Sequence, residues 1–447
     1  MIRSRAIGLL VAAIAVAAGC AHSRSDDAAR APDVDPVLAS YIDGLRAVDN
    51  HTHVNSIDPA DADYDALPID ALPPFDLPAR LRPENPEWVA AYRAVYGEAA
   101  IAGRNDLEAL GEVAARARAE HGAAFPEWVL DRIGTEVMFA NRVAMGPGLS
   151  PPRFQWVSYV DALLLPLSTR AEAAASPDRQ ALYPYEEKLL RRYLADLRLA
   201  ALPATLDGYL KGVITPTLQR QRAGGCVAVK FEAAYLRSLD FADAPREAAS
   251  RVYARYVRGG APSHAEYKAL EDFLFRAIAH EAGSLGMAVH VHSFEGAGAF
   301  YRASESDPWL LESALDDPAL RGTNFVIVHG GGGAAARAGS LLWKPNVYVD
   351  FSAMVLIYPP ATLARVLRGW LEQYPEKVLF GTDAAAFGPG IGWDVTAALG
   401  TSTARRALAM ALTGMMRESE ISRARAEEIA AMVMRANAAK LYRLPLS

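Results

Sequence analysis

Eight short runs rich in β-branched and aromatic residues recur along the chain, and long segments compatible with helices separate most of them. The runs cover residues 46–53, 136–141, 155–163, 225–231, 287–292, 324–329, 347–351 and 377–383. Consecutive parallel strands need a long crossover connection, which is usually a helix. Eight repeated units of this kind predict an α/β fold, a (β/α)8 TIM barrel. The alternative is an open doubly wound sheet, but the Gly-rich dinucleotide fingerprint typical of that fold does not follow the first run.

The alternation of side chains within the runs agrees with a barrel, in which every second residue faces inward. In four runs one of the two alternating faces ends, at its C-terminal tip, in a residue that can bind a metal or carry a proton. These residues are Lys230, His292, His329 and Asp383. In the sixth run we expect Val326 and Val328 to face outward, opposite His329.

The chain is longer than a plain barrel, which needs about 250 residues. The excess among the 447 residues falls mainly at about 54–135 and 166–224. Both insertions follow predicted strands, the first and the third, so we expect helical cap insertions on the mouth side of the barrel. Asp58, Asp61, Asp63 and Asp65 lie in the first insertion, and we interpret them as solvated turns because a calcium loop would also need a central Gly and a terminal Glu.

Composition excludes several classes of protein. The 46 Lys and Arg against 52 Asp and Glu give a formal net charge of -6, which argues against nucleic acid as a partner. Two cysteines, Cys20 and Cys226, exclude a disulfide framework or a Cys-rich metal site.

Histidines at the strand tips indicate a metal site. Five of the nine histidines lie at such tips: His51, His53, His290, His292 and His329. The spacing of His51 and His53 places both imidazoles on one face of a strand, and neutral imidazole is the commonest ligand of zinc and related cations. Asp383 ends an apolar strand and completes a ligand set, although an Asp there can also cap the following helix.

Four motifs in chain order resemble the metal-site signature of the amidohydrolase superfamily. They are Asp49-Asn50-His51-Thr52-His53, Val289-His290-Val291-His292, Ile327-Val328-His329-Gly330-Gly331-Gly332 and Phe380-Gly381-Thr382-Asp383. The closer likeness is to the amidohydrolase-related branch, which includes aminocarboxymuconate semialdehyde decarboxylase. The resemblance extends from about residue 47 to the C-terminus and implies a barrel with one or two divalent metal ions, which we expect to be Zn.

By this resemblance His51, His53 and Asp383 bind the first metal. A divalent cation lowers the pKa of bound water from 15.7 toward about 7 and polarises the bond to be cleaved. Asp383 would then take a proton from that water and deliver it to the leaving group. His329 is implied either as a ligand of a second metal or as a catalytic base or carbonyl polariser.

The resemblance also implies a way to hold a second metal. Binuclear relatives carry a carbamylated lysine at the tip that Lys230 occupies, and His292 and His329 would share the second ion with it. The alternative for Lys230 is a pair with Glu232 or with a substrate carboxylate.

Two further features near the strand tips have a supporting role. We interpret His290, one layer deeper in the barrel, as a residue behind the ligands or in the core. Residues 330–333 predict a tight turn with exposed amides, and a phosphate cradle is the alternative.

Arg142, Tyr235 and Arg237 lie near the predicted strand tips and are candidates to orient an anionic small-molecule substrate. A structural or surface role is the alternative for each.

Taken together, these features and the resemblance lead us to expect a metal-dependent hydrolase of an amide, ester or lactone. The alternatives are a metal-dependent decarboxylase and a binding protein without catalysis.

The N-terminus resembles that of a bacterial lipoprotein. Arg3 and Arg5 precede a short apolar run, and the segment Val16-Ala17-Ala18-Gly19-Cys20 resembles a lipobox. We therefore predict a signal peptide at 1–19, lipidation of Cys20, a flexible tether at 20–38 and the barrel domain at 39–447. The resemblance implies a protein anchored by lipid on the periplasmic side of the outer membrane of a Gram-negative bacterium.

Overall fold

The computed structural model describes residues 34–446. The predicted signal peptide, Cys20 and most of the predicted tether lie outside the described residues. Helix α1 (Pro36–Gly44) already occupies the end of the segment that we expected to be a tether. The Asp35 carboxylate accepts hydrogen bonds from the N–H groups of Val37 and Leu38, and this cap starts the helix.

Eight parallel strands form one sheet in the order β1 to β8, with each strand paired to the next. The strands are β1 (Ala47–Thr52), β2 (Thr135–Arg142), β3 (Phe154–Tyr159), β4 (Cys226–Phe231), β5 (Ala288–His292), β6 (Phe325–Val328), β7 (Val347–Asp350) and β8 (Val378–Leu379). All eight predicted strands are present, and the predicted TIM barrel is confirmed.

The barrel closes through the residues that follow β8. The Asn50 N–H donates to the Phe380 carbonyl at 2.9 Å, and the Asp383 N–H donates to the His51 carbonyl at 2.8 Å. A parallel bridge joins Thr52 to Ala384. These bonds bring the end of the chain's last strand beside the histidines of its first strand.

Small and medium apolar side chains fill the barrel. This inner cluster consists of Val48, Val137, Phe139, Val157, Ala228, Ala288, Val326, Val328, Leu379 and Ala438. Our expectation for the sixth strand is wrong, because Val326 and Val328 face inward while Phe325 and Ile327 pack against the surrounding helices. His329 nevertheless reaches the mouth, because its backbone turns to a left-handed conformation with φ +65° and breaks the alternation.

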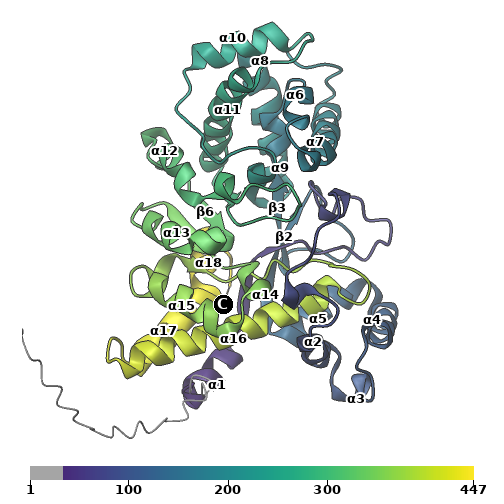
Figure 1. Cartoon of the computed structure of the whole chain (residues 1–447), viewed down its shortest axis with the longest axis vertical. Coiled ribbons are helices and arrows are strands. Elements are labelled where there is room, and N and C mark those ends of the chain that lie inside the picture. The colour runs from purple at the N-terminus through teal and green to yellow at the C-terminus, as the bar shows by residue number, and fades with distance from the viewer. Residues whose placement is uncertain (1–33, 447) are drawn as a thin grey trace, which may run out of the picture. The chain divides into compact units, whose positions relative to one another are not determined.

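Helices surround the barrel (Figure 1). The remaining helices are α2 (Glu87–Tyr96), α3 (Glu98–Ile101), α4 (Leu107–His121), α5 (Phe125–Ile133), α6 (Arg170–Ala173), α7 (Pro177–Asp196), α8 (Leu206–Tyr209), α9 (Thr215–Ala223), α10 (Arg246–Tyr256), α11 (His264–Ser284), α12 (Glu312–Leu315), α13 (Ala335–Leu341), α14 (Met354–Ile357), α15 (Pro360–Leu371), α16 (Trp393–Arg417), α17 (Arg423–Ala431) and α18 (Asn437–Tyr442). Both insertions contain helices, but α2 to α5 lie in a different region of Figure 1 from α6, α7 and α8.

Helix α18 packs against the inner cluster, to which it contributes Ala438 and against which its Leu441 and Tyr442 lie. The Tyr442 ring lies 4.5 Å from the ring of Phe139. Its hydroxyl lies 2.6 Å from His290 Nε2 and donates a hydrogen bond to Asn50 Oδ1. Tyr442 thereby joins β1 and β5 across the barrel interior.

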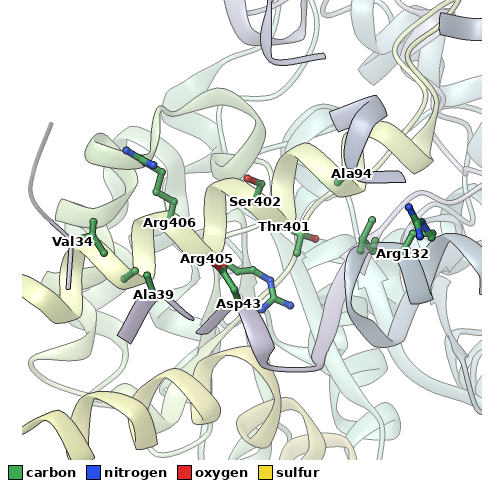
Figure 2. Close-up of a pocket in the computed structure, with 12 residues that line it drawn as sticks. Val34, Ala39, Asp43, Ala94, Arg132, Thr401, Ser402, Arg405 and Arg406 are labelled. Atoms are coloured by element: carbon green, nitrogen blue, oxygen red, sulfur yellow. The ribbon is translucent and has the colours of Figure 1, made fainter. Parts of the chain in front are cut away.

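A cavity of about 380 Å³ lies outside the barrel, between α1, α5 and α16 (Figure 2). Arg132, Arg405 and Arg406 line it, and none of the predicted site residues does. Arg405 donates to the carbonyls of Ile42 and Leu45, so it caps the end of α1. No helix among residues 34–446 combines the length and apolar character that crossing a bilayer requires.

Candidate metal centre

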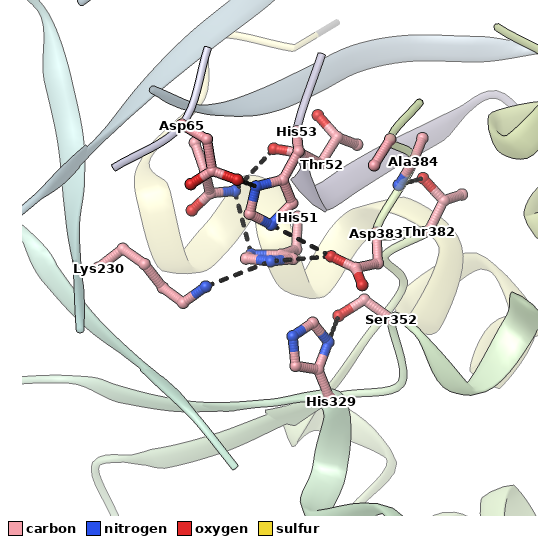
Figure 3. Close-up of polar contacts among 12 residues, drawn as sticks. His51, Thr52, His53, Asp65, Lys230, His329, Ser352, Thr382, Asp383 and Ala384 are labelled. Atoms are coloured by element: carbon pink, nitrogen blue, oxygen red, sulfur yellow. Dashed lines mark hydrogen bonds and ion pairs between the residues drawn. The ribbon is translucent and has the colours of Figure 1, made fainter. Parts of the chain in front are cut away.

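Two imidazoles and one carboxylate converge at the mouth of the barrel (Figure 3). Asp383 Oδ1 lies 3.3 Å from His51 Nε2 and 3.3 Å from His53 Nε2. One ligand atom from each of the three residues lies within 4.8 Å of the others. The structure therefore brings together the three side chains that we predicted for the first metal.

Local backbone irregularities make this convergence possible. The β1–β2 register shifts between Asp49 and Thr52, so the strand bulges where His51 lies. Asp383 has φ +60°, a left-handed conformation that aims its side chain at the histidines. The Asp49 carboxylate accepts from the Thr382 N–H at 2.9 Å and from the Thr382 hydroxyl at 2.6 Å, which fixes the chain next to Asp383.

The donor set fits a divalent cation. Asp383 Oδ1 is buried and has no hydrogen-bond partner among residues 34–446, although it lies between two imidazole nitrogens. Two histidine nitrogens and a carboxylate oxygen are a ligand set of catalytic zinc sites. Burial, followed by the positive charge of Lys230, keeps the pKa of His51 well below its usual range, so this ring is neutral and has a nitrogen lone pair for a metal.

His53 is held differently because two carboxylates flank it. Burial lowers the pKa of His53, but the charges of Asp65 and Asp383 outweigh burial and raise that pKa to about 10. His53 Nδ1 lies 3.2 Å from Asp65 Oδ2 and 3.1 Å from the Tyr159 hydroxyl. Without a metal His53 is therefore protonated, and a cation at Nε2 has to displace a proton.

His292 and His329 continue the group of imidazoles. The ring of His329 lies 4.9 Å from that of His51 and 4.7 Å from that of His292. Burial lowers the pKa of both His292 and His329 well below the usual value, and the charge of Lys230 acts in the same direction. His329 Nδ1 lies 2.8 Å from the Ser352 hydroxyl, which orients the ring.

Lys230 lies at the inward tip of β4, as predicted. Its Nζ is 3.5 Å from His51 Nε2 and 3.3 Å from Glu232 Oε1. Both the metal centre and the alternative partner Glu232 are therefore within reach. His290 lies one layer deeper, fully buried, with Tyr442 as its partner.

The three candidate substrate residues have different surroundings. The Arg142 guanidinium is fully buried and donates to the Val54 carbonyl at 2.7 Å and to Asp61 at 2.7 Å. Arg237 donates to Glu271 at 2.9 Å and to Asp272 at 2.6 Å. Both arginines thus hold protein carboxylates, whereas the Tyr235 ring lies 4.8 Å from that of His292, beside the site.

The interpretation of the aspartates after β1 as solvated turns fails for two of them. Asp61 binds the buried Arg142, and Asp65 binds His53, with only 8% and 11% of their side chains exposed. Asn141 is a further residue that the sequence did not indicate, and its Nδ2 lies 3.0 Å from His51 Nδ1. The four aspartates lie close together in a Pro-rich loop, and nothing in that sequence separates these two from Asp58 and Asp63.

A sequence model of a protein family, described as Amidohydrolase, matches residues 220–444. The chain belongs to the amidohydrolase family. The amidohydrolase match covers about half of the chain and contains Lys230, His292, His329 and Asp383, whereas His51 and His53 precede it. A comparison with curated protein sequences finds no match.

Three solved structures are similar to this chain in fold. A protein of Lactobacillus casei described as a metal-dependent hydrolase has 16% identity and a TM-score of 0.55, over 92% of this chain and 98% of that one. A glucuronate isomerase of Caulobacter crescentus has 14% identity and a TM-score of 0.59, over 92% and 94%. A uronate isomerase of Thermotoga maritima has 14% identity and a TM-score of 0.54, over 91% and 96%. At such identities the likeness concerns the fold alone.

Proposed function

We propose that the protein is a metal-dependent hydrolase that cleaves an amide, ester or lactone bond of a small molecule. The observation that carries this proposal is the Asp383 oxygen between His51 Nε2 and His53 Nε2, 3.3 Å from each. When bound there, a divalent cation, for which zinc suits the ligand set, supplies Lewis acidity and makes water a nucleophile at neutral pH.

The residues of the chain supply the remaining steps. The second oxygen of Asp383 accepts a proton from the attacking water and passes it to the leaving group. The Ser352 hydroxyl donates to Asp350 and therefore accepts from His329 Nδ1, so Nε2 of the neutral His329 ring is free to act as a catalytic base. The Tyr235 ring packs against His292 and would contact the substrate through its aromatic surface.

The surroundings of the arginines favour a hydrolase over a decarboxylase. A decarboxylase has to anchor a carboxylate, and Arg142 and Arg237 were our candidates to orient an anionic substrate, with a structural or surface role as the alternative. Both guanidinium groups instead bind protein carboxylates. A neutral bond such as an amide, ester or lactone does not need such an anchor.

Metal analysis combined with a substrate panel tests this proposal. We expect His51→Ala, His53→Ala and Asp383→Asn to lose hydrolysis of an amide, ester and lactone panel, and both histidine variants to lose bound metal. His280→Ala is the matched control, because His280 is exposed on α11. Full metal content and activity in His53→Ala would contradict the assignment, and carbon dioxide release from carboxylic acids without hydrolysis would favour the decarboxylase.

A further inference from the structure

A group of acidic side chains lies next to His53 and Lys230, and the proposed hydrolysis does not use it. Asp65 comes from the loop after β1, Asp161 from the turn after β3, Glu232 from the end of β4 and Glu186 from α7. Glu186, Asp161 and Glu232 are 0%, 1% and 4% exposed. We call these four residues the carboxylate group.

Glu186 has no partner for its charge. It lies on the buried face of α7, where the neighbouring turns carry Leu182, Leu189 and Tyr193. Neither of its carboxylate oxygens has a hydrogen-bond partner among residues 34–446. After burial, the effects that most raise its pKa are the charges of the other members of the carboxylate group: Asp161, Glu232 and Asp65. A buried carboxylate without a partner is unfavourable as an anion, so Glu186 has to be neutralised either by a proton or by a nearby cation.

Two other members of the group also have a carboxylate oxygen without a hydrogen-bond partner among residues 34–446. Asp161 Oδ2 accepts from the Glu232 N–H at 2.8 Å, but Asp161 Oδ1 has no partner within the described part of the chain. Glu232 Oε1 faces Lys230 Nζ at 3.3 Å, and Glu232 Oε2 is likewise without a partner there. Lys230 thus contacts only one member of the group, Glu232, and the oxygens of Asp161, Glu186 and Glu232 that lack partners among the described residues are buried.

Asp65 and Glu232 lie close enough to share an ion. One oxygen from each lies within 4.8 Å of the other and of a nitrogen of His53. Asp65 lies on the opposite side of His53 from Asp383 (Figure 3). An ion held by Asp65 and Glu232 would thus be separate from one held by His51, His53 and Asp383.

We propose that Asp65 and Glu232, with Glu186 and Asp161 behind them, bind a divalent cation that prefers oxygen ligands. Carboxylates are the ligands of Mg²⁺, Mn²⁺ and Ca²⁺, whereas the imidazole-rich centre suits zinc. Asp65 can hold the His53 N–H with one oxygen and the cation with the other. The site goes beyond the proposed hydrolysis, because it needs neither a substrate nor a metal at the first centre.

The competing explanation is that protons neutralise the group without any ion. On that explanation the buried carboxylate oxygens without hydrogen-bond partners in the described part of the chain carry protons when no cation is present. The substitution Glu186→Gln separates the two explanations, because glutamine has the shape of a protonated glutamate but cannot balance a cation. If Glu186 is a neutral acid, Glu186→Gln should leave Mn²⁺ binding unchanged. If Glu186 is an anion that balances a cation, the substitution should weaken Mn²⁺ binding.

The test is titration of the chelator-treated full chain with Mn²⁺, followed by electron paramagnetic resonance and calorimetry, after zinc has been added to fill the first centre. We expect Glu186→Gln and Glu232→Gln to weaken Mn²⁺ binding about tenfold or more, the usual effect of changing a residue in or behind a metal site. Glu187→Gln is the matched control, since this neighbour on α7 is 44% exposed. We expect it to bind Mn²⁺ like the wild type.

Three further variants separate this site from other metal sites. His51→Ala should lose zinc but keep Mn²⁺, so the carboxylate site survives even if the hydrolase proposal fails. His292→Ala and His329→Ala should also keep Mn²⁺, whereas an ion held by carbamylated Lys230 would be lost with them. If Glu186→Gln binds Mn²⁺ like the wild type and melts at a higher temperature, Glu186 is a neutral acid and the proposal is wrong. Asp161→Asn provides the same comparison if Glu186→Gln does not fold.

Discussion

Lys230 has surroundings that do not suit an ammonium group next to a metal. Its side chain is fully buried, and its Nζ lies 3.5 Å from His51 Nε2. A cation held by His51 would repel the ammonium, because a bound metal is the largest local charge in such a site. A lysine that becomes an anion would be attracted to that metal instead.

We predict that Lys230 is carbamylated and carries a second metal together with His292 and His329. The neutral amine adds to carbon dioxide, forms an N–C bond and releases a proton. The wild type incubated with ¹³C-bicarbonate should then give a carbamate carbon signal, and Lys230→Ala should lose both the signal and one metal ion. Lys211→Ala, on the protein surface, is the control. An unchanged metal content in Lys230→Ala would leave Lys230 as the partner of Glu232.

At the scale of single elements, the turn after β6 is the most constrained segment of the mouth. Gly330, Gly331 and Gly332 have φ of +55°, +77° and +54°. A Cβ at Gly330 would collide with the Trp370 ring and would lie 2.9 Å from the Asp350 carbonyl. The turn therefore has no room for a Cβ atom, and its positive φ angles disfavour any residue other than glycine.

We predict that Gly330→Ala lowers the free energy of unfolding by about 2 kcal/mol or more, because strain and a steric clash add together. Gly369→Ala is the control. Gly369 lies inside α15 with nothing near its missing Cβ, so alanine there should be neutral or stabilising by up to about 1 kcal/mol. Urea denaturation of both variants measures the difference. Equal stabilities would show that the turn can rearrange.

The strands were predictable from sequence because each carries its own pattern, whereas the irregular tips were not. Alternation gave the inward positions of Lys230 and His292 correctly. It failed at His329, because a positive φ at a non-glycine residue has no sequence signal there. Asp65 was missed for another reason: its role depends on where a long loop folds back, and the loop sequence does not encode that locally. The convergence of His51, His53 and Asp383 was predictable because the C-terminal ends of parallel strands meet at one rim of a barrel.

At the scale of the whole molecule, the predicted attachment to a membrane would depend on Cys20, which lies outside the described residues. We predict that Cys20→Ser moves the protein from the membrane fraction to the soluble fraction, because the acyl chains on Cys20 are the predicted anchor. Cys226→Ser is the matched control, since Cys226 is buried at the start of β4. Fractionation of cells that express each variant measures the change. Sedimentation of Cys20→Ser with the membranes would contradict the lipoprotein prediction.

Tyr442 has a consequence for the order in which the molecule can be made. Asn50 and His290, on strands far apart in the sequence, share this one hydroxyl as a partner inside the barrel. A ribosome delivers Tyr442 only after all eight strands, so two buried polar side chains of the nascent barrel lack this partner until α18 has been synthesised. The barrel interior therefore reaches its final hydrogen-bonded form only after α18 has joined the eight strands.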